Sequence, residues 1–125
     1  MKKYAAPGAL VIDNYWSTEL GSPITSVALG AGPVAATKPG AAGFALPGMD
    51  VRVVDDKGKE IKRGRQGNIV IKTPLTGTGF RTCWKDEAGF QKSYFDRFRG
   101  RGDWFDTGDC KSKRMCYRLT FSGDD

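Results

Sequence analysis

Apolar residues fall in short blocks along this chain, separated by polar turns and by stretches rich in Gly and Pro. Residues 9–12 read Ala-Leu-Val-Ile, which predicts a short buried strand. Valines on both sides of Arg52 predict a second strand, followed by an Asp-Asp-Lys-Gly turn at residues 55–58. Residues 69–71 predict a third strand, and we expect it to pair with the second in a small antiparallel sheet. Between them, residues 59–66 are polar and expected to be exposed.

The segment that begins at residue 86 is the one good helix candidate. It starts with acidic residues and ends with Arg97 and Arg99, an arrangement that complements the helix dipole. Four aromatic residues recur at intervals of four, one and three, and so form one apolar stripe: Phe90, Tyr94, Phe95 and Phe98. The Gly-Arg-Gly sequence at residues 100–102 is expected to end the helix.

Glycine and proline organise much of the remainder. Residues 29–48 are rich in both and predict loop with short extended pieces. Thr-Gly-Asp at residues 107–109 follows an aromatic pair, and residues 115–121 predict a last strand. The chain has 17 glycines, which favours a β-rich fold over a helical bundle because each one suits a turn and weakens a helix.

Composition narrows the chemistry. A chain of 125 residues is one domain or part of one. Twenty basic and 14 acidic residues give a net charge of +6, which permits attraction to nucleic acid, acidic membranes or nucleotide phosphates. The basic residues are scattered, however, as on an ordinary solvated face. The chain contains no His, so Ser-His-Asp triads and His-ligated zinc are excluded within it.

The cysteines and the N-terminal segment bear on the compartment. Cys83, Cys110 and Cys116 lack C-x-x-C spacing, which indicates reduced thiols rather than a disulfide framework or a zinc knuckle. Pro7 and Gly8 interrupt the apolar run near the start, so we expect no signal peptide. No run approaches the roughly 20 apolar residues of a membrane span. These features predict a cytoplasmic location.

Several short patterns match known motifs but lack their context. Residues 30–35 fit a relaxed G-x-G-x-x-A dinucleotide pattern, but the prolines within and after it forbid the helix that would bind pyrophosphate. Residues 76–79 lack the Lys of a phosphate loop, and residues 101–103 spell the adhesion tripeptide, so we predict plain turns at both. The Arg, Gly and aromatic cluster at residues 98–105 suits single-stranded nucleic acid, but aromatic packing in a core at a helix end is the favoured interpretation.

Residues 13–21 carry the strongest candidate chemistry. They read Asp-Asn-Tyr-Trp-Ser-Thr-Glu-Leu-Gly and combine carboxylates, hydroxyls and two large aromatic rings within nine residues. We expect this segment to follow the strand at residues 9–12 as a loop at its carboxyl end, where functional residues commonly lie.

The motifs have an informative order. Trp-Ser-Thr-Glu-Leu-Gly at residues 16–21 is followed by two Pro-Gly pairs, the Val-rich strand with its turn, Gly-Asn-Ile-Val-Ile at residues 67–71, Trp84, the Tyr-Phe helix and Thr-Gly-Asp at residues 107–109. Along nearly its whole length the chain resembles acetyl- and propionyl-CoA synthetases of the AMP-forming, adenylate-forming superfamily. The resemblance implies an α+β, β-rich fold: an antiparallel sheet or distorted half-barrel subdomain from the C-terminal part of the large AMP-binding domain, with one amphipathic helix.

The resemblance also implies roles for single residues. Thr18 would offer a hydroxyl to the α-phosphate and Glu19 would bind Mg²⁺, and these two form the implied catalytic pair. Asp109 would accept hydrogen bonds from both ribose hydroxyls. The implied nucleotide-binding set is Asp13, Asn14, Tyr15, Trp16, Ser17, Thr18 and Asp109, the first three on the adenine side. The interpretation requires Glu19 and Asp109 to face one nucleotide cleft.

The implied reaction is acyl activation. A carboxylate attacks the α-phosphate of ATP to give an acyl-adenylate and pyrophosphate, and the thiol of coenzyme A then displaces AMP. ATP or AMP, Mg²⁺ and coenzyme A are thus the implied cofactors and co-substrates, and positioning and charge neutralisation do most of the catalysis. Trp16 falls where short-chain members carry a Trp that closes the acyl pocket, which implies acetate or propionate as the substrate.

Members of the family are several times longer than this chain. The resemblance makes residues 1–125 a partial AMP-binding domain, the distal part of the large N-terminal domain up to the hinge, without the phosphate loop and the small C-terminal domain. The family has Gly-Arg-x-Asp-Asp at the hinge, whereas residues 117–125 read Tyr-Arg-Leu-Thr-Phe-Ser-Gly-Asp-Asp. We therefore expect a fragment that is inactive alone, in the cytoplasm or, for a full-length parent, the mitochondrial matrix.

The expected partners follow from the same interpretation. They are a nucleotide and a short-chain carboxylate, with no membrane, and with self-association through apolar surface that other domains would normally cover. A small basic β-rich module that binds nucleic acid remains the alternative function, and its binding would weaken steeply as salt rises.

Overall fold

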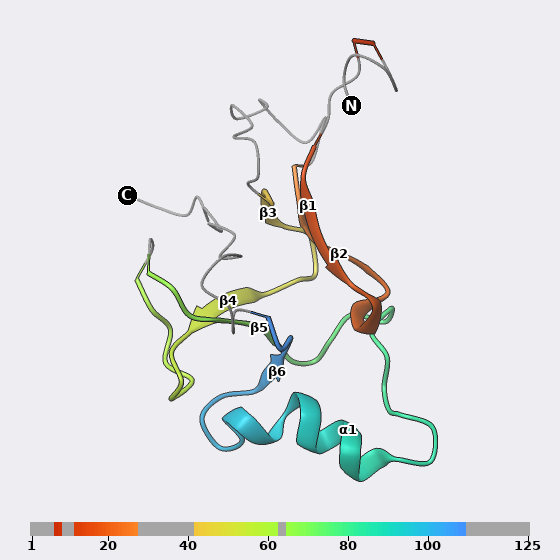
Figure 1. Cartoon of the computed structure of the whole chain (residues 1–125), viewed down its shortest axis with the longest axis vertical. Coiled ribbons are helices and arrows are strands. Elements are labelled where there is room, and N and C mark those ends of the chain that lie inside the picture. The colour runs from red at the N-terminus through yellow and green to blue at the C-terminus, as the bar shows by residue number, and fades with distance from the viewer. Residues whose placement is uncertain (1–6, 9–11, 28–41, 63–64, 110–125) are drawn as a thin grey trace.

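The computed structural model describes residues 7–8, 12–27, 42–62 and 65–109. These residues form two three-stranded antiparallel sheets and an α-helix (Figure 1). The elements in chain order are β1 (Asn14–Ser17), η1 (Thr18–Leu20), β2 (Ser22–Ser26), β3 (Phe44–Ala45), β4 (Val51–Val54), β5 (Asn68–Lys72), α1 (Glu87–Tyr94), η2 (Asp96–Phe98) and β6 (Trp104–Asp106), where η marks a single 3-10 turn. The expected β-rich α+β fold with antiparallel pairing and one helix is confirmed.

The first sheet has the order β1-β2-β3 and is built on a tight hairpin. The turn η1 joins β1 to β2, and Gly21 closes it with φ +63°, a left-handed conformation that glycine adopts without a steric penalty. The expectation of a loop after a strand at residues 9–12 was therefore wrong for residues 14–17, which are the strand. The aromatic residues Tyr15 and Trp16 favour extended backbone, and β2 supplies the hydrogen-bonding partner. Residues 9–11 lie outside the described ranges.

The second sheet has the order β4-β5-β6. The predicted antiparallel pair is confirmed: Val51 lies opposite Ile71, and Val54 lies opposite Asn68. The third strand, β6, was not predicted; it pairs with β5 on its other side, with Ile71 opposite Phe105. Because β5 is central and covered on both faces, its residues 68–71 are all buried and read as a continuous apolar run after Asn68.

The helix begins as expected and ends earlier than expected. Asp86 caps it, with its side chain accepting a hydrogen bond from the backbone N–H of Gly89 at 2.9 Å. The α-helix stops at Tyr94 because Phe95 leaves the helical region with φ −128°, and the chain tightens into η2 before β6. The predicted aromatic stripe is nevertheless buried or half-buried throughout, and α1 runs past the β6 side of the second sheet (Figure 1).

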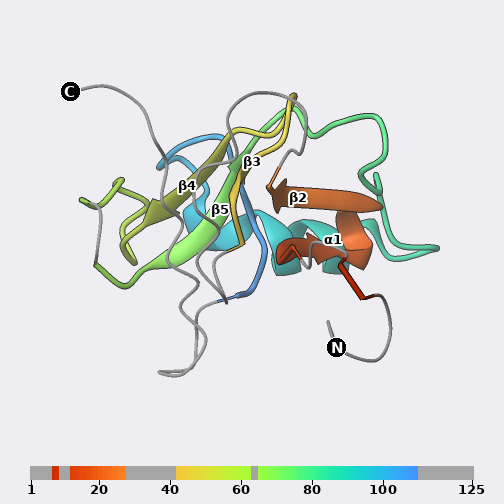
Figure 2. The ribbon, with the colours of Figure 1, turned by 90° about the horizontal axis from the view of Figure 1, so that it is seen from above.

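The core lies between the two sheets and the helix. One cluster joins residues from both sheets: Tyr15, Leu20, Ile24, Ala42, Val51, Ile69, Ile71 and Phe105. A smaller cluster of Val54, Val70 and Phe98 fills the opposite face of β5, with Trp104 packed against it. Seen from above, β4 and β5 lie side by side, and the β1-β2 hairpin passes in front of α1 (Figure 2). Alternate residues of β5 thus enter different clusters, as the strand period of two requires.

Several predictions fall outside the described residues. They are the dinucleotide-like pattern at residues 30–35, Cys110, Cys116, the last strand at residues 115–121 and the hinge-like segment at residues 117–125. Within the described ranges, the predicted turn at residues 76–79 is confirmed by the hydrogen bond from the N–H of Gly79 to the carbonyl of Thr76 at 2.9 Å. None of the helices in those ranges has the length and apolar character needed to cross a bilayer.

Candidate nucleotide site

Two motifs that are 94 residues apart in the sequence meet in the structure. The hydroxyl of Tyr15 on β1 donates a hydrogen bond to the carboxylate of Asp109. Tyr15 is the buried residue of β1, whereas its neighbours Asn14 and Trp16 are exposed, because successive side chains of a strand point to opposite faces. The hydrogen bond from the phenol therefore places the Asp-Asn-Tyr segment next to the Thr-Gly-Asp segment.

The Thr-Gly-Asp turn is anchored to the end of β5. The hydroxyl of Thr107 donates to the carbonyl of Ile69 at 2.8 Å, and the same hydroxyl accepts a hydrogen bond from the N–H of Asp109 at 3.3 Å. Gly108 has φ +74°, where a Cβ atom would be strained. These contacts explain why this turn uses Thr and Gly, and they present the half-buried Asp109 beside β1.

Glu19 lies next to two aromatic residues, Phe80 before α1 and Tyr94 at the end of α1. Its carbonyl accepts a hydrogen bond from the N–H of Phe80 at 2.8 Å, which ties η1 to the segment that precedes α1. Burial raises the pKa of Tyr94, and the nearby carboxylate of Glu19 adds to this rise because a phenolate would be repelled there. The phenol of Tyr94 is therefore a neutral neighbour of Glu19 at neutral pH.

An aromatic layer connects this region to β6. Tyr94 stacks on Phe105, with ring centroids 5.1 Å apart and an angle of 3° between the ring planes. The rings of Phe80 and Tyr94 form an edge-to-face pair, with centroids 5.2 Å apart. Phe105 lies on β6, the strand that leads into Thr107 and Asp109, so this layer connects the region of Glu19 to the strand that carries the Thr-Gly-Asp turn. Whether both carboxylates face a single nucleotide cleft stays a prediction.

The other predicted site residues lie along the same hairpin. Asn14 lies opposite Ser26 in the sheet, and Asp13 directly precedes β1. Trp16 is 58% exposed, so its indole is available to a ligand rather than committed to the core. Thr18 is exposed in η1, as its predicted role requires.

Ser17 combines burial with an unused hydrogen-bonding group. Its hydroxyl oxygen is buried and has no hydrogen-bond partner within the described part of the chain. A buried hydroxyl without a partner costs stability, so this oxygen has an unused capacity to hydrogen-bond with a bound molecule.

Acidic and sulfur ligands do not gather in this region. Among the described residues, no three His, Cys, Asp or Glu side chains lie close enough together to hold a metal ion. Glu19 is thus a single carboxylate, which fits an ion that takes most of its ligands from substrate phosphates and water.

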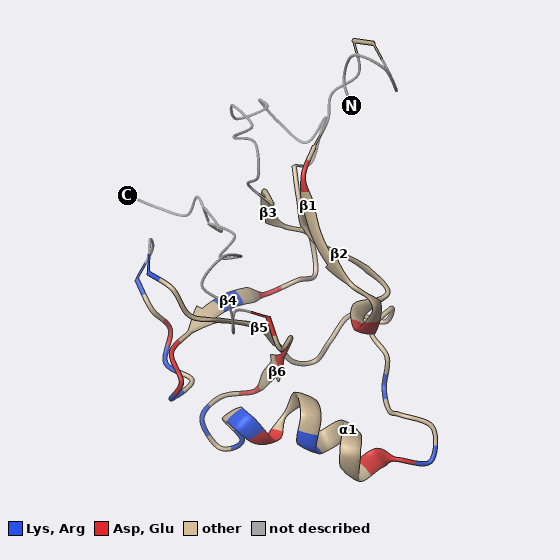
Figure 3. Ribbon diagram, in the orientation of Figure 1, with Lys and Arg blue, Asp and Glu red and all other residues tan. Residues whose placement is uncertain are grey.

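The aromatic residues that suggested nucleic-acid binding are core residues. Phe98 and Phe105 are buried, and Trp104 packs against the smaller core cluster, as the favoured interpretation required. Arg97 and Arg99 form ion pairs with Asp56 and Asp96. Figure 3 shows Lys and Arg dispersed among acidic residues over the β4-β5 loops and α1, without a continuous basic stripe. Neither the stacking surface nor the phosphate track of such a module is present in the described residues.

Sequence reasoning missed several residues around the site. Tyr94 was predicted only as part of a helix face, and Phe80 and Asp106 were not singled out. Asp106 is buried beside Arg97, a combination that no local pattern signals because the two residues belong to different elements.

Comparisons with known proteins agree with this arrangement. Residues 1–81 match the family model for AMP-binding enzyme. Over 98 residues the chain is 41% identical to human acyl-CoA synthetase short-chain family member 3, mitochondrial, covering 78% of this chain and 14% of that protein. It is 38% identical over 99 residues to the acetyl-coenzyme A synthetase of Nitrosomonas europaea, covering 79% of this chain and 14% of that protein.

Solved structures give the same result. The fold matches apo MatB from Rhodopseudomonas palustris with a TM-score of 0.60 and 33% identity, covering 82% of this chain and 18% of that one. It also matches the anthranilate CoA ligase AuaEII in complex with anthranoyl-AMP, with a TM-score of 0.62 and 26% identity, covering 86% and 18%. The chain spans about one seventh of the length of the two sequence relatives, at 14%. This chain therefore belongs to the AMP-binding enzyme family and corresponds to one part of the longer family members.

Proposed function

We propose that the chain forms part of the nucleotide-binding region of an AMP-forming short-chain acyl-CoA synthetase. The full enzyme would convert acetate or propionate, ATP and coenzyme A to acyl-CoA, AMP and pyrophosphate through an acyl-adenylate. The observation that carries the proposal is the hydrogen bond from Tyr15 to Asp109, because it unites the two motifs that the family uses for AMP. Residues 1–125 would be the distal part of the large domain.

The residues divide into three groups by chemistry. Asp109 accepts hydrogen bonds from the ribose hydroxyls, and Tyr15 holds its carboxylate. Asp13 and Asn14 line the adenine side with Tyr15, and Thr18 donates to the α-phosphate with Ser17 nearby.

The exposed Trp16 closes the acyl pocket and limits the substrate to two or three carbons. Among the groups proposed here, it is the one that sets the length of the substrate.

Magnesium belongs to the same proposal. Glu19 would supply its one protein carboxylate, which fits a hard cation bound mainly through phosphate and water. When bound, such an ion would neutralise phosphate charge while the carboxylate of the substrate attacks the α-phosphate. The chain's own contribution is to hold Glu19 in place through the Phe80 hydrogen bond and the aromatic layer.

Calorimetric titration of the purified chain with AMP tests the proposal. We expect saturable binding that Asp109→Asn weakens by about tenfold or more, since hydrogen bonds to a charged group contribute roughly 1.5–3 kcal/mol. Arg65→Gln, a change at an exposed position in the β4-β5 loop, is the control and should leave binding unchanged. Equal AMP affinity in the Asp109 variant would refute the assignment.

Turnover, association and compartment are further parts of the proposal. We expect no acetate-dependent exchange of pyrophosphate into ATP by these 125 residues alone, since they span 14% of the length of the relative.

Self-association is supported by two exposed indoles, Trp16 and Trp84, the latter 87% exposed. The compartment would be the cytoplasm or, as the name of the mitochondrial relative suggests, the mitochondrial matrix.

A further inference from the structure

Asp106 is a buried carboxylate directly before the Thr-Gly-Asp turn. Its side chain is 7% exposed, and both of its oxygen atoms have partners. One oxygen, Oδ1, accepts a hydrogen bond from the backbone N–H of Gly108 at 2.9 Å. The side chain of Asp106 therefore closes a small turn over the residue that immediately precedes Asp109.

The second oxygen of Asp106 faces a cation from a different element. Nη1 of Arg97, in η2, donates to Oδ2 of Asp106 at 3.3 Å. Nη2 of Arg97 donates to Asp56 at 2.7 Å, so one guanidinium bridges η2, the β4-β5 turn and the end of β6. A planar guanidinium with several fixed donors suits such a bridge better than the flexible ammonium of Lys.

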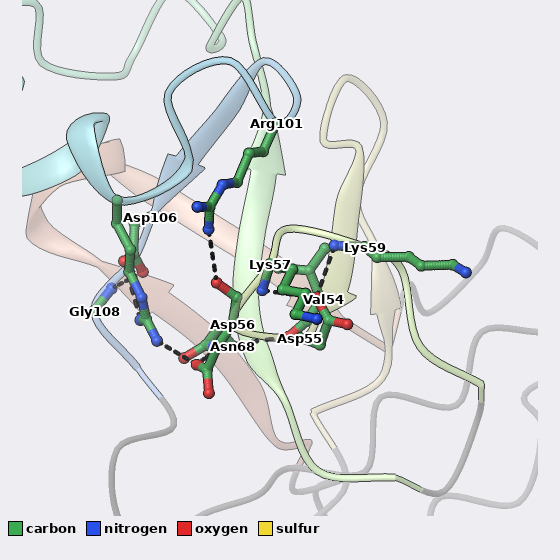
Figure 4. Close-up of polar contacts among 10 residues, drawn as sticks. Val54, Asp55, Asp56, Lys57, Lys59, Asn68, Arg101, Asp106 and Gly108 are labelled. Carbon is green, nitrogen blue, oxygen red and sulfur yellow. Dashed lines mark hydrogen bonds and ion pairs between the residues drawn. The ribbon is translucent and has the colours of Figure 1, made fainter.

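Asp56 is itself held from two further sides. Its carboxylate accepts a hydrogen bond from the amide of Asn68 at 3.1 Å, and its carbonyl accepts one from Arg101 at 3.3 Å. Figure 4 shows Asp56 between Arg101 and Asn68, with Asp106 beside Gly108 at the other end of the group. The exposed Asp56, tied to Asn68 of β5, thus contacts the guanidinium of Arg97 on the side away from Asp106.

The arrangement makes the Gly108 turn depend on Arg97. A buried carboxylate that loses its cation partner is poorly compensated where it lies and gains by moving toward water. Such a movement disturbs the hydrogen bond from Gly108, which closes a turn with φ +74° at that residue. Because Asp109 is the next residue, its carboxylate would lose its position beside Tyr15.

We propose that Arg97 is a positioning residue for nucleotide binding: through Asp106 it holds the turn that presents Asp109 to the ribose. This inference rests on the proposed function of Asp109 and adds a residue that contacts neither nucleotide nor substrate. The inference assigns this role to Arg97 and not to Arg99, which forms an ion pair with Asp96 on the exposed surface.

Arg97→Gln and Arg99→Gln form a matched pair, since each removes one positive charge from the same short segment. The ligands are AMP and 2′,3′-dideoxy-AMP, which lacks both ribose hydroxyls. In the unchanged chain AMP should bind about tenfold more tightly than the dideoxy analogue. Arg97→Gln should reduce this preference severalfold, Arg97→Lys should restore part of it, and Arg99→Gln should leave it unchanged.

Backbone amide exchange gives a readout that is independent of nucleotide. The Gly108 N–H should exchange about tenfold faster in Arg97→Gln than in the unchanged chain, since loss of one hydrogen bond of this kind corresponds to that factor. Amides of β5, such as that of Val70, should exchange at unchanged rates, which would show that the variant remains folded.

The outcomes separate the two proposals. If Arg97→Gln weakens AMP and the dideoxy analogue equally, Arg97 acts on general stability and the inference is wrong. If the unchanged chain does not distinguish the two ligands, the role assigned to Asp109 fails, and Gly108 exchange alone then decides whether Arg97 holds the turn. Unchanged Gly108 exchange in Arg97→Gln would overturn the inference in either case.

Discussion

The two sheets of this chain use their strands differently. In β5, at the centre of the second sheet, residues 68–71 are all buried because apolar groups cover both faces. In β1, at the edge of the first sheet, Tyr15 is the buried residue and both of its neighbours are exposed. Both sheets contribute to the core, but the first also presents polar and aromatic groups to solvent beside Asp109. A candidate site can therefore lie on the exposed face of an edge strand whose other face belongs to the core.

The largest contrast is expected from Phe105→Ala against Trp16→Ala. Phe105 is 1% exposed and stacks on Tyr94, so its truncation should lower the free energy of unfolding by about 3–5 kcal/mol. Trp16 is mostly exposed, and its truncation should cost about 1 kcal/mol at most. Urea denaturation followed by circular dichroism measures both. Equal costs would show that the Trp16 side chain is as much a part of the core as the Phe105 side chain.

A glycine between β2 and β3 offers a sharper test of the first sheet. Gly43 has φ +79°, and a Cβ atom there would lie 2.3 Å from the carbonyl carbon and oxygen of Ser26. Gly43→Ala should therefore destabilise the chain by about 2–4 kcal/mol, from backbone strain and steric overlap together. Gly77→Ala is the control, because a Cβ atom at Gly77 meets nothing within 4 Å. If both variants unfold at the same urea concentration, the β2-β3 connection does not hold the first sheet together.

The contact between β1 and Asp109 can be measured as a coupling energy. Tyr15→Phe removes the hydroxyl that donates to the Asp109 carboxylate and should cost about 1.5 kcal/mol of stability. In an Asp109→Ala background the same substitution should cost about 1 kcal/mol less, because its partner is already absent. Identical costs in the two backgrounds, measured by urea denaturation, would mean that the motifs are adjacent without being coupled.

The smallest effect concerns pH and the segment that leads into α1. The hydroxyl of Thr82 and the amide of Gln91 donate to Glu87 and lower its pKa below the ordinary value of 4.5. The folded state therefore resists protonation of Glu87. The stability that this contributes is present above the ordinary pKa and is lost as pH falls through the lowered one.

Thr82→Val should raise the pKa of Glu87, as followed by NMR titration of its carboxylate carbon. Asp55, whose pKa is lowered mainly by a hydrogen bond from the backbone N–H of Lys59, is the internal control and should titrate as before. A Glu87 titration that does not respond to the loss of the Thr82 hydroxyl would rule out that contact.

Local pattern was sufficient where burial is continuous or periodic. The Val-rich strand, the Ile-Val-Ile strand and the capped helix were predictable, because strand and helix periods place apolar residues on faces that the core requires. The strands β1, β2 and β6 were not predicted. Read from the sequence alone, Pro23 argues against a strand at β2, because proline has no N–H to donate. It is tolerated because β3 pairs with Thr25 and Ser26 and does not extend as far as Pro23. Strand β6 has three residues, too few for a period, and is defined by pairing with β5.

The candidate site divides in the same way. The resemblance of residues 13–21 and 107–109 to one family was visible from residue types and order. The family model, which matches residues 1–81, confirms the family and includes the first of these two segments. The neighbours of these segments were not visible, since Tyr94 reaches Glu19 from α1 and Arg97 reaches Asp106 from η2. Such contacts join residues on different elements, and no periodic pattern in the sequence indicates that these residues are close in space.

By itself, the sequence determined the family, the antiparallel β4-β5 pair, the helix and the residue types available for nucleotide binding. It could do so because hydrophobic period, capping and motif order are local properties of the chain. Only the tertiary structure decided that Tyr15 supports Asp109 and that a buried Asp106 links Arg97 to the turn before it. These contacts depend on how two sheets and a helix pack in three dimensions, and packing is a property of the whole fold.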